Sequence, residues 1–531
     1  MRPIAFLRWP ALLMTAIAIV TSAYIVASAA IRPAMYSDSG WGFAAWDTRS
    51  RTSAFNHAAG LDSSDIAREA EGFMTMWSPG QHVLPGLIEE AGVSLGAALV
   101  AVSAVFSILG LAGWFSLYRS FGFPLRTAMV ALAIIACSRF FNLPFSTYNG
   151  GEVLQFGVAP WFLLLVWALR DLRWFAVPPL IAGAAVLVFM KLTGIVIAGA
   201  AVGFAMVSHD RPWRHWRDTA RKLLVGGVTV GLMGVLFYVA WYRRGATAAT
   251  IVGVPHPHGL LFYVALTLSS TWSAALSLGD LANYIFLNPA RPILRSVETI
   301  FYVFLPFSLA TFGFIYLSLR KDHGEYLRFA FLFAATMVVF LTLNLSAGMS
   351  ITLDERHLRI ASLLLLVGGV HAVLECRSRI LQGVFAAIAA LSMVYGLSSF
   401  VQRMQHNLQD PLGARGVRVA NATPQLLDFI RKIDVSGPDA RRTLIFMPSP
   451  ELILEVKNAR SWSNHADFES IDDLRKQIRR GRVDRLYVIV QRKLLDNGKA
   501  DAILRSFVDY PIDGWTRIPL GDFVCFYQVS S

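Results

Sequence analysis

The sequence predicts a polytopic α-helical membrane protein with a small α/β domain after its last membrane span. The 531 residues are 55% hydrophobic and only 16% charged, whereas soluble domains carry roughly 45–50% apolar and about 25% charged residues. Long apolar runs recur through the first 400 residues, and charged residues become frequent only beyond them. Mean hydropathy is +0.51. The composition therefore excludes a soluble, fibrous or disordered chain.

About eleven apolar runs are candidates for membrane spans, since a spanning helix needs roughly 20 apolar residues. They lie at about 10–31, 93–117, 125–141, 151–169, 175–190, 194–207, 223–242, 297–319, 327–345, 357–374 and 380–400. The stretch 175–207 is read as two short spans that meet at Lys191, and one long tilted helix is the alternative.

The distribution of basic residues predicts the orientation of these spans. The net charge is +13, and arginine and lysine gather in alternate short loops, while the 32–92 loop is net acidic. Short basic loops stay in the cytoplasm, so the N-terminus is expected inside and, after eleven crossings, the C-terminus outside. The first run is expected to be a retained anchor, although Ala27-Ser28-Ala29 also resembles the end of a cleavable signal peptide.

Residues 401–531 are predicted to form the outer α/β domain, and residues 1–400 the membrane domain. Thr443–Met447 and Arg485–Val490 have the apolar pattern of buried strands. Thr423–Ile433 and Ser470–Arg480 have that of amphipathic helices, each beginning at a hydroxyl side chain suited to cap a helix.

Two outer loops, 32–92 and 243–296, are much longer than a connection between helices requires, and long loops tend to be functional. Both contain tryptophan and helix-like apolar periodicity. This pattern predicts helices lying along the outer membrane surface. Two such loops on one face of a bundle would form the walls of a cleft.

Asp38 is the first candidate for catalysis. It lies just after the first span, between Tyr36 and Trp41. A carboxylate that is partly desolvated among aromatic rings becomes more basic, which suits a general base that deprotonates an acceptor hydroxyl. The same position also suits a helix cap or a solvated acid in an acidic loop, and both interpretations stay open.

A turn later in the same loop is the second candidate. Pro79 and Gly80 follow Trp77 and predict a turn, after which Gln81 and His82 lead into a short helix before the second span. These side chains would line the cleft, or the motif would serve the turn alone.

Basic residues near the outer ends of spans form a third group. Lys191 is an ionisable residue at a span end, where it either serves a function or extends its ammonium group to the membrane surface. Arg356 lies in the segment Asp354-Glu355-Arg356-His357, which leads into the tenth span. Its guanidinium suits a lipid phosphate, and pairing with the adjacent acids is the alternative.

A metal site has little support in the sequence. His256 and His258 could supply two imidazoles, but a metal site needs further ligands and none is evident nearby. No glycine-rich nucleotide loop of the common types is present. The cysteines Cys137, Cys376 and Cys525 suggest neither a disulfide nor a zinc spacing.

Four local motifs together with this layout resemble the GT-C membrane glycosyltransferases. The motifs are YSDSGW at 36–41, MWSPGQHVLPGLI at 76–88, MKLTG at 190–194 and DERHLRIASLLLL at 354–366. The chain is similar in layout to the bacterial members of this superfamily, of the protein O-mannosyltransferase and aminoarabinose transferase type. In the last motif, His357 stands where tyrosine is commoner in the family.

The resemblance implies an inverting transfer of a sugar from a polyprenyl-phosphate donor to an acceptor hydroxyl at the outer face of a bacterial cytoplasmic membrane. Asp38 would be the general base, and Asp47 a second acid. Because Ser39 rather than another acid follows Asp38, the need for a divalent metal stays open. Lys191, Arg356 and His357 would hold the donor phosphate. The cleft would be lined by Tyr36, Trp41, Trp77, Gln81, His82 and Glu355.

Other functions remain as alternatives. A transporter or flippase of lipid-linked saccharides would place acids and broken helices near the bilayer midplane, often in inverted repeats, and the sequence displays neither. A non-catalytic assembly partner is a further alternative. An O-antigen polymerase or ligase would carry its critical arginine and histidine in one large outer loop. The sequence names neither the sugar nor the acceptor, which could be an envelope glycan, a lipid or a protein.

Overall fold

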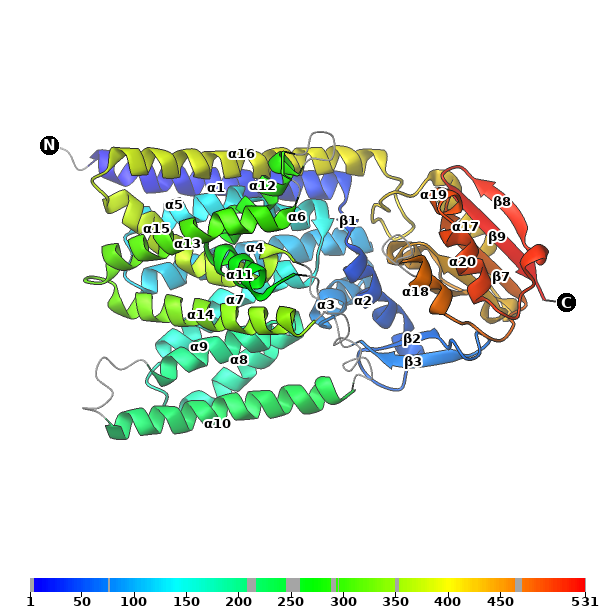
Figure 1. The fold of residues 1–531 in the computed structure, drawn as a ribbon, viewed down its shortest axis with the longest axis horizontal. Coiled ribbons are helices and arrows are strands. Elements are labelled where there is room, and N and C mark those ends of the chain that lie inside the picture. The colour runs from blue at the N-terminus through cyan, green and yellow to red at the C-terminus, as the bar shows by residue number, and fades with distance from the viewer. Residues whose placement is uncertain are drawn as a thin grey trace. The chain divides into compact units, whose positions relative to one another are not determined.

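The computed structural model describes residues 4–74, 77–207, 216–244, 258–287, 293–294, 296–348, 353–463 and 470–530. The chain forms two compact units (Figure 1). Residues 1–27, 103–145 and 151–403 form the first, which we call the helical unit. Residues 28–102, 146–150 and 404–531 form the second, which we call the α/β unit.

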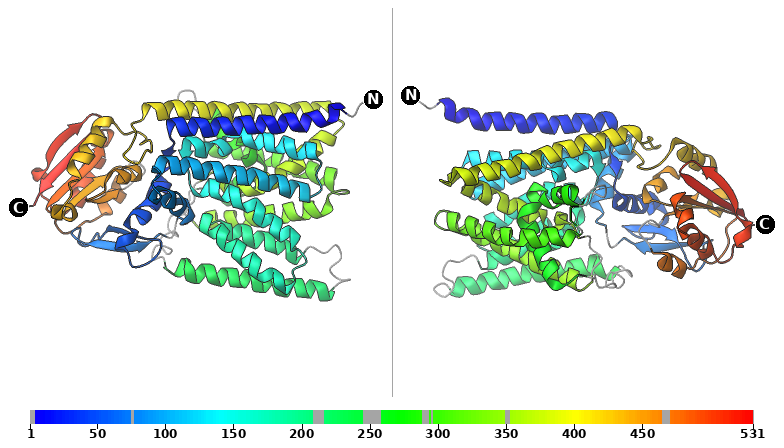
Figure 2. Two further views of the ribbon diagram at one scale, coloured as in Figure 1. Left: turned by 180° about the vertical axis from the view of Figure 1, so that it is seen from behind. Right: turned by 45° about the horizontal axis from the view of Figure 1, so that its top comes forward.

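The helical unit is built from long apolar helices that run side by side (Figure 2). Its helices are α1 (Ile4–Ile31), α4 (Leu95–Ser120), α5 (Leu125–Cys137), α6 (Arg139–Ser146), α7 (Gly151–Ala168), α8 (Val177–Met190), α9 (Gly194–Met206), α10 (Trp216–Ala240), α11 (Leu260–Ser273), α12 (Leu278–Phe286), α13 (Val297–Leu319), α14 (Gly324–Ser346), α15 (Arg359–Glu375) and α16 (Arg379–Gln409). The short 3-10 helices η2 (Trp174–Ala176), η3 (Tyr242–Arg244), η5 (Ala274–Leu276) and η6 (Glu355–Leu358) lie between them. Aromatic contacts join distant segments, as where Tyr24 of α1 meets the Phe400 ring of α16 edge-on at 4.7 Å.

The chain is a multi-pass membrane protein. Among the described residues, eight helices are long and apolar enough to cross a bilayer, or up to ten if each of two bent helix pairs is one span. Eight of the eleven predicted spans correspond to the long helices, and 125–141 corresponds to the bent pair α5–α6. The remaining two correspond to the shorter apolar helices Trp174–Met190 and Gly194–Met206. The predicted count of eleven is therefore not confirmed.

The 243–296 loop contains the other bent pair. Phe262 and Leu266 of helix α11 are buried against Phe301 and Leu345 of neighbouring helices. The chain then bends by 96° before α12. Ser277 makes this bend with a left-handed backbone, at φ 50°, which interrupts the helical hydrogen-bond ladder. Residues 245–257 of this loop lie outside the described residues.

The α/β unit has a five-stranded sheet in the order β6-β5-β7-β9-β8. The strands are β5 (Thr443–Met447), β6 (Arg460–Ser463), β7 (Arg485–Gln491), β8 (Thr516–Leu520) and β9 (Phe523–Val529). β5 pairs in parallel with β6 and β7, and β9 pairs antiparallel with β7 and β8. The two strands predicted from the sequence, at 443–447 and 485–490, are β5 and β7.

Helices cover both faces of this sheet. Alternate strand residues point to opposite faces, and buried apolar residues occur on both. The remaining elements of this region are α17 (Pro424–Ile433), η7 (Pro438–Arg442), η8 (Pro450–Glu455), α18 (Ile471–Lys476), α19 (Lys493–Asp496), α20 (Lys499–Ser506) and η9 (Ile512–Gly514). Ile445 and Met447 share one buried cluster with Ile430 of α17. Leu444 and Phe446 belong to the opposite cluster.

Both predicted helix caps are present, but one helix is shorter than expected. The Thr423 and Ser470 hydroxyls accept hydrogen bonds from the amides of Leu426 and Asp473, at 3.2 and 3.1 Å. The expected helix 470–480 ends at Lys476. The Arg479 amide instead donates to the Ser506 carbonyl at 2.7 Å, so this backbone pairs with a neighbouring segment.

The 32–92 loop contains strands that the sequence did not predict. Helix α2 (Ser37–Thr48) and the short η1 (Arg49–Arg51) precede an antiparallel hairpin of β2 (His57–Leu61) and β3 (Glu69–Phe73), and α3 (Gly80–Glu90) follows. The short strands β1 (Ala34–Met35) and β4 (Thr147–Tyr148) pair in parallel. Ile66, between the hairpin strands, is buried in the core of the five-stranded sheet. Although the sequence-based division assigned the loop to residues 1–400, it packs in the α/β unit.

Candidate functional site

A cluster of cations around one carboxylate lies in the helical unit. The Lys191 ammonium is 2.6 Å from Oε1 of Glu152, and the Nε atom of Arg356 is 4.0 Å from the same oxygen. Lys191 follows the end of α8, Glu152 lies in the first turn of α7 and Arg356 lies in η6. Two residues predicted independently to contact phosphate thus share one partner.

The local backbone holds these side chains in place. A Cβ atom on Gly151 would lie 3.3 Å from Cγ of Lys191, so glycine allows the lysine stem to pass close to α7. Gln155 of α7 donates to the Thr193 hydroxyl at 2.7 Å, which joins α7 to the turn after Lys191. The Asp354 carboxylate accepts the Arg356 amide at 2.8 Å and caps η6.

A small pocket adjoins the cluster and is lined by residues that include Glu152, Gln155, Arg359 and Ser107. Most of the other lining side chains are apolar. Arg359 is buried, and its guanidinium lies 5.0 Å from the ring centre of Phe140. Among the described residues, the Nε atom of Arg359 and the Ser107 hydroxyl are buried without a hydrogen-bond partner. The cavity therefore combines an apolar wall with unsatisfied donors.

Glu355 has a different environment from the one expected of a cleft residue. It is only 2% exposed, and its carboxylate accepts the Ser273 hydroxyl at 2.9 Å and the Gly279 amide at 3.1 Å. It thus receives amides in the first turn of α12, where a negative charge is favourable. Its contacts are those of a residue that positions α12. His357 lies half-buried in η6 beside Arg356.

The predicted base lies in the α/β unit. Asp38 is half-buried in the first turn of α2. Tyr36 precedes this helix, is 39% exposed, and donates its amide to the Tyr148 carbonyl at 2.9 Å. The β1–β4 pairing therefore fixes the backbone from which α2 begins.

Three tryptophans meet one turn beyond Asp38. The rings of Trp41 and Trp77 stack with centroids 6.3 Å apart. Trp462 of β6 meets the Trp41 ring edge-on at 6.1 Å. All three are half-buried. Because Trp41 lies three residues after Asp38, the two share a face of α2.

Asp47, the suggested second acid, belongs to an ion-pair network. Its carboxylate is 2.6 Å from Nη1 of Arg415, and the same guanidinium forms two hydrogen bonds with Glu89 of α3. Burial raises the pKa of Asp47, and the positive charge of Arg415 opposes that rise. These contacts join α2, α3 and the 411–418 segment.

Gln81 and His82 are buried, at 5% and 2% exposure, and His82 contributes to the lining of a pocket beside Trp46 and Arg49. The Tyr148 hydroxyl donates to the Gln81 carbonyl at 2.8 Å. Gly150 has φ +46°, a left-handed backbone conformation that favours glycine, and a Cβ atom there would lie 2.5 Å from the Gln81 amide oxygen. Both the backbone conformation and the close contact therefore require glycine at this position. Burial lowers the pKa of His82 to about 3.

Sequence reasoning missed three members of these groups, Glu152, Arg359 and Trp462. Glu152 was the easiest of the three to identify from the sequence, because an acid at the start of an otherwise apolar span is energetically unfavourable and usually functional. Arg359 belongs to the motif at 354–366 but was not singled out. Trp462 lies in a strand far from the other tryptophans in sequence, and only the fold brings it to Trp41.

No metal centre is evident in the part of the chain that the structure describes, since no three His, Cys, Asp or Glu side chains come together there in a way that could hold an ion. His256 lies outside the described residues. The Nδ1 atom of His258 instead contacts the Glu298 carboxylate.

Comparison with known proteins identifies the fold. No family model and no curated protein matches the sequence. The crystal structure of ArnT from Cupriavidus metallidurans in the apo state matches over 98% of both chains, with a TM-score of 0.53 and 13% identity. This chain has the fold of the GT-C glycosyltransferases. This match runs through nearly the whole length of the chain.

Two further structures give lower scores. ArnT from the same organism bound to undecaprenyl phosphate matches over 98% of both chains with a TM-score of 0.47 and 13% identity. The oligosaccharyltransferase of Archaeoglobus fulgidus in the apo form matches 93% of this chain and 71% of its own, with a TM-score of 0.48 and 12% identity.

Proposed function

We propose that this protein is a glycosyltransferase that moves a sugar from a polyprenyl-phosphate donor to an acceptor hydroxyl at the outer face of a bacterial cytoplasmic membrane. One observation carries the proposal: Lys191 and Arg356 converge on Glu152 beside a largely apolar cavity, in a chain with the GT-C fold. Such a site suits a ligand with both a phosphate and a hydrocarbon chain.

The charge balance of the cluster supports binding of the donor phosphate. Lys191, Arg356 and Arg359 bring three positive charges to the Glu152 carboxylate, and Asp354 lies 3.7 Å from the Arg356 guanidinium. One positive charge remains, and a phosphate would neutralise it. A guanidinium group binds phosphate through bidentate hydrogen bonds, which a lysine ammonium cannot form. Arg356 is therefore expected to orient the donor.

The transfer is a displacement at the anomeric carbon of the donor sugar. The acceptor oxygen forms a bond to this carbon as its proton passes to the Asp38 carboxylate. The bond from the carbon to the phosphate oxygen breaks, and its electron pair leaves with the polyprenyl phosphate. Cations near the phosphate stabilise the charge that develops on it. Attack opposite the leaving group inverts the configuration.

The direct test is a transfer assay in proteoliposomes with radiolabelled polyprenyl-phosphate sugars and crude envelope acceptors. Asp38→Asn should reduce transfer by at least about a hundredfold, since general base catalysis contributes roughly 10²–10⁴ in rate. Asp62→Asn removes a charge from an acid in the same loop whose pKa is lowered by its bond to Ser64, and should transfer normally. Normal transfer by Asp38→Asn would remove the proposed base. Label that crosses the bilayer without reaching an acceptor would favour a transporter.

A second variant tests the donor side. Arg356→Gln should reduce kcat/KM for the donor by roughly a hundredfold, as for loss of one donor to a developing oxyanion, and leave the acceptor KM unchanged. Arg173→Gln changes an exposed arginine in the same unit and serves as the control. A defect confined to the acceptor would contradict the phosphate role of Arg356.

A further inference from the structure

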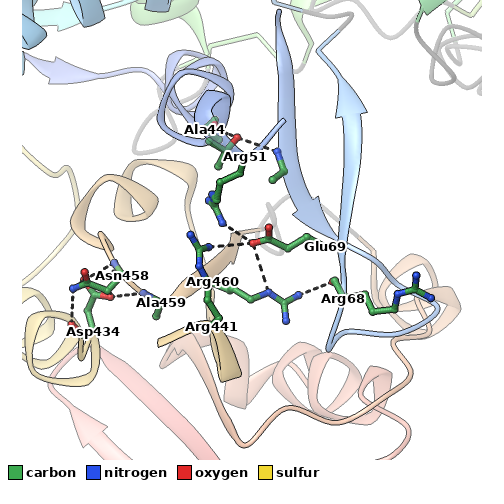
Figure 3. A network of polar contacts seen from close by, with 11 residues as sticks. Ala44, Arg51, Arg68, Glu69, Asp434, Arg441, Asn458, Ala459 and Arg460 are labelled. Atoms are coloured by element: carbon green, nitrogen blue, oxygen red, sulfur yellow. Dashed lines mark hydrogen bonds and ion pairs between the residues drawn. The ribbon is translucent and has the colours of Figure 1, made fainter. Parts of the chain in front are cut away.

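Three arginines of the α/β unit converge on a single carboxylate oxygen (Figure 3). Oε1 of Glu69 lies 2.6 Å from the Arg51 guanidinium, 3.3 Å from that of Arg441 and 3.8 Å from Nε of Arg460. Glu69 is in the β2–β3 hairpin, while Arg460 begins β6 and Arg441 lies in η7. The cluster therefore joins the 32–92 loop to the C-terminal sheet.

Arg460 is buried in this cluster without a full set of partners. It is 5% exposed, and one of its terminal nitrogens, Nη2, donates to the Arg68 carbonyl at 2.6 Å. The other, Nη1, is buried and has no hydrogen-bond partner among the described residues. An unpaired donor on a buried cation is costly, so a ligand that accepts this hydrogen bond would be favoured.

The positive charge of the cluster is not balanced. Glu69 is the only carboxylate among the described residues that forms an ion pair with these three arginines. Burial lowers the pKa of Arg460, Glu69 opposes this shift, Arg441 and Arg51 lower the pKa further, and Asp65 raises it. In direct ion pairs, three guanidinium groups thus face one carboxylate, and the negative charge of Asp65 adds a weaker compensation.

Neighbouring hydrogen bonds fix the backbone that carries the cluster. The Asp434 carboxylate accepts the amides of Asn458 and Ala459 at 3.0 and 2.7 Å, which fixes the backbone just before Arg460 (Figure 3). The side chains of Arg51 and Arg441 remain 28% and 52% exposed. The solvent-facing part of the cluster is therefore formed by Arg51 and Arg441.

We propose that Arg51, Arg441 and Arg460 form a binding site for a phosphate-type oxyanion, with Glu69 occupying part of the site in its absence. Phosphate presents several acceptor oxygens and matches the planar fork of guanidinium. The anion is either free phosphate or a phosphate carried on an envelope saccharide. The site lies in the α/β unit and is separate from the cations around Glu152, and its binding assay does not depend on sugar transfer.

Calorimetric titration of the full-length protein in maltoside micelles with inorganic phosphate would test this proposal. The measurement uses Arg356→Gln as the background, because that change weakens the proposed donor site. Arg441→Gln should weaken binding by about tenfold, the typical effect of one charge-assisted hydrogen bond. Arg442→Gln, which changes the adjacent and more exposed arginine paired with Asp484, should leave the affinity unchanged.

Glu69→Gln provides the sharpest test, because it should tighten phosphate binding by about tenfold as the competing charge is removed. Damage to the fold would weaken binding instead. Arg460→Gln should abolish binding in protein that still elutes as a single species. Absence of binding in the background protein, equal affinities in Arg441→Gln and Arg442→Gln, or no gain in Glu69→Gln would each overturn the proposal. Glucose 1-phosphate that binds more tightly than inorganic phosphate would identify a saccharide-borne ligand, and equal affinities would identify free phosphate.

Discussion

Two acids on the same helix illustrate how partners determine the role of a residue. Asp38 and Asp47 lie at opposite ends of α2. Asp47 is engaged by Arg415, which also binds Glu89, so its charge serves to join helices. Asp38 is half-buried at the start of the helix and forms no ion pair with any residue that the structure describes. Because its carboxylate is not engaged by a cation, Asp38 is the better of the two candidates for a group that accepts a proton.

His82 gives a prediction about pH. Burial lowers its pKa to about 3 in the folded protein, whereas an unfolded chain has a histidine pKa near 6.5. Between these two pKa values the unfolded state binds one more proton than the folded state. The free energy of unfolding that His82 contributes therefore falls as the pH decreases from about 6.5 toward 3, by up to about 1.4 kcal/mol per pH unit. His82→Gln should remove this dependence, as measured by denaturant unfolding from pH 7.5 to pH 4.5. Parallel pH profiles for the two proteins would contradict the burial of a neutral imidazole.

At the scale of elements, helices α2 and α3 approach closely where Gly86 of α3 contacts Trp46 of α2. A Cβ atom on Gly86 of α3 would lie 2.3 Å from the Trp46 ring of α2. Gly86→Ala should therefore destabilise the protein by about 1–3 kcal/mol, as overpacking commonly does, and should raise its sensitivity to urea. Gly72→Ala is the matched control, because a Cβ atom there would meet nothing within 4 Å. Equal stability of the two variants would show that α3 can move away without penalty.

The elements that local chemistry specifies could be predicted from the sequence. Thr423 and Ser470 cap helices as their hydroxyl groups suggest, and the apolar runs at 443–447 and 485–490 form strands. The β2–β3 hairpin escaped prediction because its strands contain Ala, Gly and Glu, which have little strand preference. Its stability comes from packing in the α/β unit, where Ile66 enters the sheet core.

At the scale of the whole molecule, the candidate site was predictable as separate residues but not as an arrangement. Lys191 and Arg356 were identified individually by their unusual positions at the ends of spans. Their shared partner, Glu152, follows from the packing of α7 beside α8 and α9, which no local pattern in the sequence specifies. The three arginines around Glu69 likewise come together only through long-range contacts.

The grouping of the 32–92 loop with the C-terminal sheet gives a last prediction. Ile66 packs among Leu444, Phe446 and Val488, so truncation after Gln405 would expose it and remove the partners of the hairpin. Trypsin should then cleave at Arg68 roughly ten times faster than in the full-length protein, since cleavage follows local unfolding.

The uneven distribution of arginine between the loops also predicts that the 32–92 loop and the C-terminus lie outside. Trypsin added outside spheroplasts should therefore cut the truncated protein, and a phosphatase reporter fused at the native C-terminus should be active. Cleavage only in inverted vesicles would show that the orientation is the opposite of the predicted one. Equal cleavage rates in the truncated and full-length proteins would show that the hairpin folds without the sheet.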